Sequence, residues 1–435
     1  MRKYTTLFAL SLTAGLLILS ACSKKESPTD KEKVAAEPIV AKPTVTQVEV
    51  FSWWTGPGEQ EGLDAMIAAF KAKNPGVEVN NAAVSGGSGT NARAILANRL
   101  QAGNPPDSYQ RHAGLELSDD IKAGKLEDLT SLYEQQGWKA KLPKGLLDAI
   151  TVSGKIYSVP VNIHRANLMW YVPKTLQSLK ISAPPKTWKE FLTQAVAIKK
   201  AGKTPLAIGP QWTQKHLLET VLLGELGPDK YTGLWNGSTD WQSKEVAAAL
   251  GTYKKVLSFS DVKSAAADWQ PASDRVLDGT AVYTVMGDWL DAYWGRAKKL
   301  TFKTDYDVAA SPGSTGVYDF LSDSFTLPVA AKNRTAALKW LEECGSTEGQ
   351  DLFNPQKGSV PARTDADKSK YTNYLASALK DWQDPNTKIV GSLTHGVVAN
   401  NALGSEIDTA LSLFAAKGDT LAFAKAVTKA YTATK

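Results

Sequence analysis

The chain has 435 residues, of which 43% are hydrophobic and 22% are charged, and its formal net charge is +6. This composition is typical of a globular protein with a sizeable core and argues against a disordered chain. The charge is weak and evenly spread along the sequence, so it does not favour nucleic-acid binding.

Residues 1–21 are predicted to be a secretion signal. Arg2 and Lys3 precede an apolar run at 7–19 that is too short to span a membrane as an ordinary helix. Residues 19–22, Leu-Ser-Ala-Cys, resemble a bacterial lipobox, which implies cleavage before Cys22 and acylation of its sulfur. The alternative is an ordinary signal peptide with an unmodified Cys. The other cysteine is Cys344, expected to be an apolar residue on a helix, so a lipidated Cys22 leaves no intramolecular disulfide.

Residues 22–45 comprise the predicted lipidated Cys and a flexible tether. The segment is polar, contains three prolines and lacks aromatic residues, a composition that does not form a packed core. A lipid anchor followed by such a tether would let a folded domain move while it remains attached to the membrane.

From residue 48 onward, strand and helix signals alternate. Val48 and Val50 show the two-residue period of a strand, whereas Leu63, Met66 and Phe70 follow helical spacing. This alternation predicts an α/β fold. Further strands are expected at 77–79 and 166–173, and helices at 92–100, from 188 onward with Thr187 as N-cap and Glu190 completing a capping box, and at 245–259, 334–343 and 403–416.

Residues 85–90 form a glycine-rich loop, Ser-Gly-Gly-Ser-Gly-Thr, before a predicted helix. The loop lacks the Gly-Lys-Ser/Thr ending of a P-loop and the glycine spacing of a dinucleotide fingerprint. We interpret it as a sharp turn that exposes backbone N–H groups and Ser88 to a neutral ligand, rather than as a phosphate site.

The first strand ends in two adjacent tryptophans, Trp53 and Trp54, and Glu59 follows after a Gly-Pro-Gly turn. The apolar face of a pyranose stacks on an indole ring, and its hydroxyls need charged or amide partners, so this segment suggests a sugar-binding surface. Neighbours in an extended segment point to opposite sides, and we expect Trp54 rather than Trp53 to face the ligand. The alternative role of Glu59 is to complement the helix dipole.

Seven short segments, spread in one order over about 350 residues, resemble the extracytoplasmic solute-binding proteins of ABC sugar importers, the group that includes maltose-binding protein. The greatest similarity is to bacterial glucose-binding proteins. The resemblance implies an α/β, two-lobed periplasmic-binding-protein fold with a hinged central cleft, with residues 46–162 and 313–357 in the first lobe and 163–312 and 358–435 in the second. The segments are Phe-Ser-Trp-Trp at 51–54, Pro-Pro-Asp-Ser-Tyr-Gln-Arg-His at 105–112, Tyr-Ser-Val-Pro-Val-Asn-Ile-His-Arg at 157–165, Met-Gly-Asp-Trp at 286–289, Leu-Ser-Asp-Ser-Phe at 321–325, Asn-Pro-Gln-Lys-Gly-Ser at 354–359 and Gly-Ser-Leu-Thr-His-Gly at 391–396.

The same resemblance implies the ligand-binding residues, which combine aromatic faces with planar polar groups. Gln110 and His112 are two residues apart and so share one side of a strand end. Asp323 and Lys357 would offset each other's charge if both face the ligand, which lowers the cost of burying them. We expect Lys357 in a loop. For Trp269 and Trp289 the alternative is a core position. The full predicted set is Trp53, Trp54, Glu59, Gln110, His112, Trp269, Trp289, Asp323, Lys357 and His395.

The resemblance implies a monomeric receptor that binds a monosaccharide, glucose or galactose, and delivers it to the transmembrane subunits of an ABC permease. It implies no catalysis, cofactor, metal or nucleic acid, and a location outside the cytoplasm, lipid-anchored at a bacterial membrane. Two alternatives remain: a glycoside hydrolase that pairs Glu59 with Asp323, and a binding protein for a non-sugar solute. The four histidines, 112, 164, 216 and 395, have no paired metal-ligand spacing.

Overall fold

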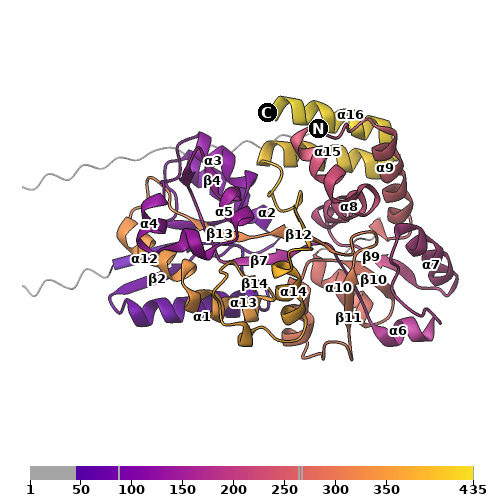
Figure 1. The fold of residues 1–435 in the computed structure, drawn as a ribbon, viewed down its shortest axis with the longest axis horizontal. Coiled ribbons are helices and arrows are strands. Elements are labelled where there is room, and N and C mark those ends of the chain that lie inside the picture. Colours follow the sequence, from indigo (N-terminus) through magenta and orange to yellow (C-terminus); the bar gives the residue numbers. More distant parts are fainter. Residues whose placement is uncertain (1–45, 87–88, 263–264, 266–267, 435) are drawn as a thin grey trace, which may run out of the picture. The chain divides into compact units, whose positions relative to one another are not determined.

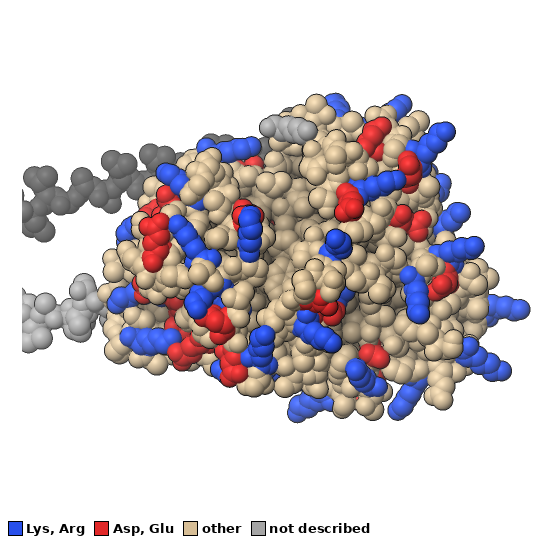
Figure 2. Space-filling model, in the orientation of Figure 1, with Lys and Arg blue, Asp and Glu red and all other residues tan. Residues whose placement is uncertain are grey.

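The computed structural model describes residues 46–86, 89–262, 265 and 268–434. The predicted secretion signal, Cys22, the tether and Ser88 therefore lie outside the described residues. Within the part that is described, every helix is too short or too polar to cross a membrane. Figure 2 shows basic and acidic side chains interspersed over the visible face, without a basic patch, which agrees with the weak net charge.

The first sheet has five strands in the order β2-β1-β3-β13-β6. Strand β1 pairs in parallel with β2 and β3, while β13 runs antiparallel to β3 and β6. Val48 and Val50 of β1 are fully buried, as their alternation predicts. The strands are β1 (Thr46–Phe51), β2 (Val77–Asn81), β3 (Ser108–His112), β6 (Val159–Pro160) and β13 (Asp323–Thr326).

The second sheet has four strands in the order β11-β8-β10-β9. Strand β8 pairs antiparallel with β10 and β11, and β9 joins β10 in parallel. The predicted apolar strand at 166–173 corresponds to β8, whose four residues are all buried. The strands are β8 (Leu168–Tyr171), β9 (Thr204–Ala207), β10 (Ala281–Val285) and β11 (Asp307–Ala310).

A third sheet, in the order β14-β7-β12-β15, is joined directly to the first. Only Val161 separates β6 from β7, and only Ser322 separates β12 from β13, so two buried links pass from one sheet to the other. The strands of the third sheet are β7 (Asn162–Arg165), β12 (Val317–Leu321), β14 (Val360–Pro361) and β15 (Lys388–Gly391); β4 (Thr151–Val152) and β5 (Lys155–Ile156) form a separate hairpin.

Helices from distant parts of the sequence pack together around the first sheet. Helices α1 (Glu59–Lys73), α12 (Arg334–Gly345) and α13 (Thr347–Lys357) contact one another, and α12 also contacts β1 (Figure 1). The other helices in this part of the chain are α2 (Thr90–Gln101), α3 (Ser118–Lys122), α4 (Thr130–Gln135) and α5 (Lys144–Ala149), with short 3₁₀ turns at Leu115–Leu117 and Trp138–Lys141.

Around the second sheet, α8 packs on α9 and α15, and α15 on α16 (Figure 1). The helices that follow β8 are α6 (Pro173–Ser178), α7 (Trp188–Lys200), α8 (Gln211–Asn236), α9 (Lys244–Leu257), α10 (Trp269–Leu277) and α11 (Trp289–Ala292), with a π-helical turn at Tyr293–Ala297. The elements that follow β14 are a 3₁₀ turn at Lys368–Lys370, α14 (Tyr374–Gln383), α15 (Asn401–Lys417) and α16 (Thr420–Thr434).

Most sequence-predicted helices are present, and one local prediction is wrong. The Thr187 hydroxyl accepts a bond from the N–H of Glu190 at 3.1 Å and caps α7, and Cys344 is buried on α12. Lys357, however, is the last residue of α13 rather than part of a loop. Pro355 removes one helical hydrogen bond, but near the end of the helix this does not stop it, and Gly358 ends it with a left-handed φ of 78°.

Gly224 on α8 marks the closest approach of this helix to the turn that follows β11. A Cβ atom added at Gly224 would lie 2.2 Å from the carbonyl oxygen of Pro312, a contact that no side chain tolerates. A Cβ atom added at Gly251 of α9 would have no neighbouring atom within 4 Å. The two helical glycines therefore serve different purposes.

We expect Gly224→Ala to lower the free energy of unfolding by about 1–3 kcal/mol, because the backbone must shift to relieve the clash. Gly251→Ala should instead raise it by up to ~1 kcal/mol, because alanine is the better helix former and meets open space. Urea unfolding of both variants measures this. Equal effects at the two positions would contradict the close approach of α8 to Pro312.

Candidate ligand-binding site

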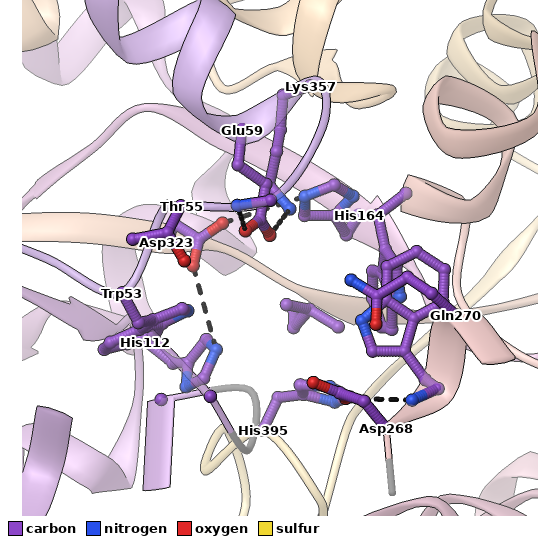
Figure 3. A pocket seen from close by; sticks show the side chains of 16 residues that line it. Trp53, Thr55, Glu59, His112, His164, Asp268, Gln270, Asp323, Lys357 and His395 are labelled. Carbon is purple, nitrogen blue, oxygen red and sulfur yellow. Dashed lines mark hydrogen bonds and ion pairs between the residues drawn. The ribbon is translucent and has the colours of Figure 1, made fainter. Parts of the chain in front are cut away.

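One cavity brings together side chains from the first and third sheets and from loops and helix ends of both halves of the chain. The empty space between them, open solvent at its mouth included, amounts to about 630 Å³. Figure 3 shows the labelled side chains converging on this space. The cavity is lined by Trp53, Thr55, Gly56, Glu59, Gly86, Gly89, His112, His164, Asp268, Trp269, Gln270, Trp289, Leu321, Asp323, Lys357 and His395.

The pairing of the strands explains this convergence. The parallel strands β1 and β3 end at the same edge of the first sheet, which places Trp53 beyond one and His112 at the end of the other. The antiparallel strand β13 starts at that edge, and its first residue, Asp323, is paired with His112. Residues more than 200 positions apart therefore meet at one edge.

Asp323 is the buried anion of the cavity. Its Oδ1 accepts a hydrogen bond from the Gln110 side-chain amide, and its Oδ2 one from Asn162, each at 2.8 Å. Burial by itself would raise the pKa of this carboxyl, but His112, Lys357 and the other polar neighbours hold it below its ordinary value. Asp323 is thus ionised, and each oxygen keeps a lone pair for a further donor.

Two imidazoles face the two oxygens of Asp323. The Nε2 atoms of His112 and His164 lie 3.7 Å from Oδ1 and Oδ2, respectively. Each ring is held from behind through Nδ1: His112 meets the Glu116 carboxylate at 2.5 Å, and His164 bonds to Asp288. An acid behind each ring fixes its orientation and leaves Nε2 for the cavity.

The burial of these pairs sets their charges. Burial would raise the pKa of Glu116, but the charge of His112 lowers it to about 2. Burial raises the pKa of Asp288 well above its usual range and lowers that of His164 well below, so this pair shares one proton and is neutral overall. The Nε2 of His164 has no hydrogen-bond partner among the described residues, and a buried polar atom of this kind is costly unless a ligand meets it.

Aromatic rings close another side of the cavity. Trp289 lies at the start of α11. The distance between ring centroids is 5.4 Å from Trp289 to His164 and 5.3 Å from Trp289 to His395. Trp269 at the start of α10 packs on Tyr293 at 5.3 Å. These two indoles are 8% exposed, and both line the cavity, so neither is confined to the core.

A further ion pair borders the cavity. The Nζ atom of Lys357 lies 2.8 Å from Oε1 of Glu59 and 5.8 Å from the centre of the Trp289 ring. The Glu59–Lys357 pair joins α1 to α13, and Lys357 lends positive charge to the neighbourhood of Asp323. Lys357 is therefore neither solvated nor unpaired, in contrast to an ordinary surface lysine.

The structure places Trp53 rather than Trp54 at the cavity, the reverse of the expectation from the sequence. Trp54 is 1% exposed and packs in the core against Phe325 and Phe353, with ring centroids 5.5 and 4.3 Å away. Trp53 lines the cavity and lies beside His112, at 5.1 Å between ring centroids. Gly89 permits this arrangement, because a Cβ atom there would lie 2.7 Å from the Trp53 ring.

Gln110 also lies outside the cavity, directly behind Asp323. Its amide nitrogen donates to Asp323, and its Oε1 accepts the backbone N–H of Trp53 at 3.1 Å. Gln110 thus positions two lining groups instead of lining the cavity itself. Of the ten predicted residues, the structure brings the other eight together around one space and leaves Trp54 and Gln110 behind it.

Several lining residues were not predicted from the sequence. His164 lay within the quoted segment at 157–165 but carried no spacing signal, and Asp268 and Gln270 flank the predicted Trp269. Gly86 and Gly89 belong to the glycine-rich loop, and both line the cavity. The loop position was therefore the available signal for the glycines, whereas His164 required the pairing of β7 with β12.

Behind His395, a buried polar group includes His216 and Glu219 of α8. Their potential ligand atoms and one of His395 lie within 4.8 Å of one another, the proximity expected of metal ligands. Each of the three side chains also makes a hydrogen bond, whereas Nδ1 of His216 has no partner among the described residues. His216 donates to the carbonyl of Ala166 at 2.8 Å, and Glu219 accepts from Ser392 and from the N–H of Thr394.

Comparison with known proteins identifies the family. The family model of bacterial extracellular solute-binding proteins matches residues 56–351. An uncharacterized ABC transporter extracellular-binding protein of Pyrococcus horikoshii is 33% identical and aligned over 96% of this chain and 93% of its own length. A probable sugar-binding periplasmic protein of Rhizobium meliloti is 31% identical, over 80% and 84%.

The fold has close counterparts among solved structures. The bacterial solute receptor AcbH superposes with a TM-score of 0.77 at 18% identity, covering 89% of this chain and 98% of that receptor. The matched family consists of solute receptors, so the prediction of a non-enzymatic protein is confirmed and the glycoside hydrolase alternative is set aside. The chain belongs to the bacterial extracellular solute-binding proteins and has their two-lobed fold.

Proposed function

We propose that this protein is the receptor of an ABC sugar importer and that it binds a monosaccharide, glucose or galactose, in the cavity around Asp323. The observation that carries the proposal is the convergence of Asp323 with the Nε2 atoms of two carboxyl-backed histidines, beside the indoles of Trp53, Trp269 and Trp289. The sugar hydroxyls would form hydrogen bonds with the polar groups, and the C–H face of the pyranose would stack on the indoles.

Each polar group suits a hydroxyl. The oxygens of Asp323 already accept one amide hydrogen each, which leaves them free to accept from two sugar hydroxyls. The imidazoles of His112 and His164 face the same space with one nitrogen each, and His395 borders it from the loop after β15. This alternation of acceptors and adaptable nitrogens matches adjacent ring hydroxyls, which both donate and accept.

The lining suits a sugar better than a cationic cargo. Lys357 pairs with Glu59, and the immediate neighbours of Asp323 are imidazoles and amides that can bond to hydroxyls. The names of relatives point the same way, since the Rhizobium meliloti protein is called a probable sugar-binding periplasmic protein.

We propose the lobe boundaries that the sequence suggested, 46–162 with 313–357 and 163–312 with 358–435, except that the boundary at 312 moves to Ser322, because β12 pairs with β7 and β15. In this division the ligand is held between groups of both lobes, Asp323 and Trp53 on one side and Trp289 and His395 on the other. The links at Val161 and Ser322 lie beside the cavity and are the natural points for hinge bending. Closure would couple sugar binding to a shape that the permease recognises, and the receptor would act as a monomer.

Calorimetric titration of ligand-stripped residues 46–435 tests the cargo. We expect one-to-one binding of glucose or galactose, and weaker or no binding of maltose, a dipeptide and putrescine, because the lining indoles and polar groups suit the face and the hydroxyls of one ring. Tighter binding of maltose would assign an oligosaccharide instead. Binding of putrescine but of none of the sugars would refute a sugar receptor.

The two adjacent tryptophans provide a matched pair of variants. Trp53→Ala should weaken sugar binding by about tenfold, the equivalent of ~1.4 kcal/mol of lost stacking, while the apo protein unfolds close to wild type. Trp54→Ala should lower the free energy of unfolding by about 3–5 kcal/mol, since it leaves a cavity between Phe325 and Phe353. Calorimetry and urea unfolding separate the effects; the reverse assignment would place Trp54 in the site.

We propose further that Cys22 carries lipid and that residues 23–45 tether the receptor to the outer side of a bacterial membrane. Cys22→Ser should then move the protein from the membrane fraction to the soluble extracytoplasmic fraction, because several acyl chains are needed for stable attachment. Cys344→Ser, at the buried cysteine, is the control and should remain with the membrane. Continued sedimentation of Cys22→Ser with membranes would contradict the anchor.

A further inference from the structure

Ser392 places its hydroxyl between a buried carboxyl group and a histidine of the cavity. Its Oγ atom lies 3.1 Å from each oxygen of Glu219 and 2.9 Å from Nδ1 of His395. It also accepts the backbone N–H of His395 at 3.2 Å. Ser392 follows the last residue of β15, and Glu219 comes from α8, so the three groups connect the core of the second lobe to the cavity.

The hydroxyl has one hydrogen, and two arrangements pair it with both Glu219 and His395. One lone pair of Oγ is occupied by the N–H of His395. If Glu219 is ionised it can only accept, so Ser392 donates to it and must accept a hydrogen from Nδ1 of His395. If Glu219 is protonated it donates to Ser392, and the serine hydrogen is then directed to Nδ1.

His395 carries one proton in both arrangements. Burial lowers the pKa of His395 well below its usual range, so the ring is neutral. Since Nδ1 meets Ser392, Nε2 is the nitrogen left for the cavity that His395 lines (Figure 3). Nε2 is a bare acceptor when Nδ1 holds the proton, and a donor when it does not.

We propose that Glu219 acts through Ser392 as a positioning residue that decides whether His395 offers the sugar a hydrogen-bond acceptor or a donor. The inference rests on the proposed sugar-binding function for its effect on affinity, but not for the hydrogen-bonded chain itself. An ionised Glu219 makes Nε2 an acceptor, and a protonated Glu219 makes it a donor. No proton enters from the ligand. Glu219 gains one proton from solvent, Nδ1 of His395 releases its proton to solvent, and Nε2 takes one up from solvent, so the group gains one proton overall while the serine hydrogen turns from Glu219 to Nδ1.

Glu219 is placed to change state near neutrality. Burial raises its pKa to about 7, against the opposing effect of its bonds from Thr394 and Ser392 and of the charge of Lys215. The carboxyl is therefore protonated below about pH 7 and ionised above it. The acceptor form of His395 belongs to the higher pH, and the donor form to the lower.

Other titratable groups face Glu219 and have defined states. Burial lowers the pKa of His216 to about 4 and raises that of Tyr231 well above its usual range, so both stay neutral from pH 5.5 to 8.5. Lys215 is paired with Asp408 at 2.9 Å. Asp319 on β12 is the remaining neighbour; burial and the charge of Glu219 raise its pKa, which makes it the competitor for the proton.

The tautomer of His395 can be read directly. The chain from residue 22 onward, with Cys22→Ser and ¹⁵N-labelled histidine, would be studied without ligand by long-range nitrogen–proton spectra between pH 5.5 and 8.5. We expect the His395 proton on Nδ1 at pH 8.5 and on Nε2 at pH 5.5, with one transition near pH 7. A wild-type tautomer that is constant over this range overturns the proposal without the need for any variant.

Variants then assign the transition. Glu219→Gln keeps an amide that donates to Ser392, so His395 should hold its proton on Nε2 at every pH, and Ser392→Ala should abolish the transition. Ser158→Ala removes a buried hydroxyl that has no hydrogen-bond partner among the described residues, and should behave as wild type. Asp319→Asn should keep the transition at a lower pH. Loss of the transition in Asp319→Asn and its survival in Glu219→Gln would overturn the role of Glu219.

Glucose titrations link the tautomer to binding. For each protein we take the ratio of the glucose affinities at pH 5.5 and pH 8.5. The wild-type ratio should differ at least threefold from the ratio in Glu219→Gln, because only the wild type reverses the polarity of Nε2. Equal ratios in the two proteins would overturn the effect of Glu219 on the ligand. If glucose does not bind at all while the tautomer still changes, the assigned sugar is wrong and the hydrogen-bonded chain stands.

Discussion

The structure around the cavity depends on holding one ionised carboxylate, Asp323, away from water. Removing a lone carboxylate from water costs several kcal/mol, and the protein offsets that cost with two amide hydrogen bonds and the nearby Lys357. The amides come from separate segments: Gln110 from β3 and Asn162 from β7. The backbone N–H of Asp323 also donates to Asn162, so one amide fixes both ends of this residue. The sheet junction and the binding groups are therefore built around the same anion.

This requirement explains why the cavity lies where the sheets join. Asp323 begins β13 of the first sheet, immediately after Ser322 leaves β12 of the third, and Asn162 begins β7 immediately after Val161 leaves β6. A hinge needs segments that bend without breaking the hydrogen bonds of a sheet, and single residues between two strands meet that need. Asp323 and Asn162 adjoin these links, so in the proposed function ligand binding and hinge bending would act on the same few residues.

The sequence predicted the layers of the fold better than the direction of individual side chains. Hydrophobic periods located α9, α12 and α15, and a capping box located the start of α7, because these signals are local. The choice between Trp53 and Trp54 was not local. Both follow β1, and alternation alone says only that they point apart; Phe353 of α13 decides which indole enters the core. Most of the predicted set came from resemblance, and His164 was missed because only strand pairing brings it to Asp323.

A common arrangement relates the three histidines of the cavity. In each, Nδ1 faces an acid, directly for His112 with Glu116 and His164 with Asp288, and through Ser392 for His395 with Glu219. A sugar is neutral, so a site gains specificity from the direction of its hydrogen bonds rather than from net charge. An imidazole whose rear nitrogen is fixed presents a front nitrogen of defined polarity, whereas a free imidazole adapts to either. If a sugar binds here as we propose, the acids behind the rings would contribute to selectivity although none of the three lines the cavity. The serine before His395 makes that ring the one whose polarity we propose to be reversible.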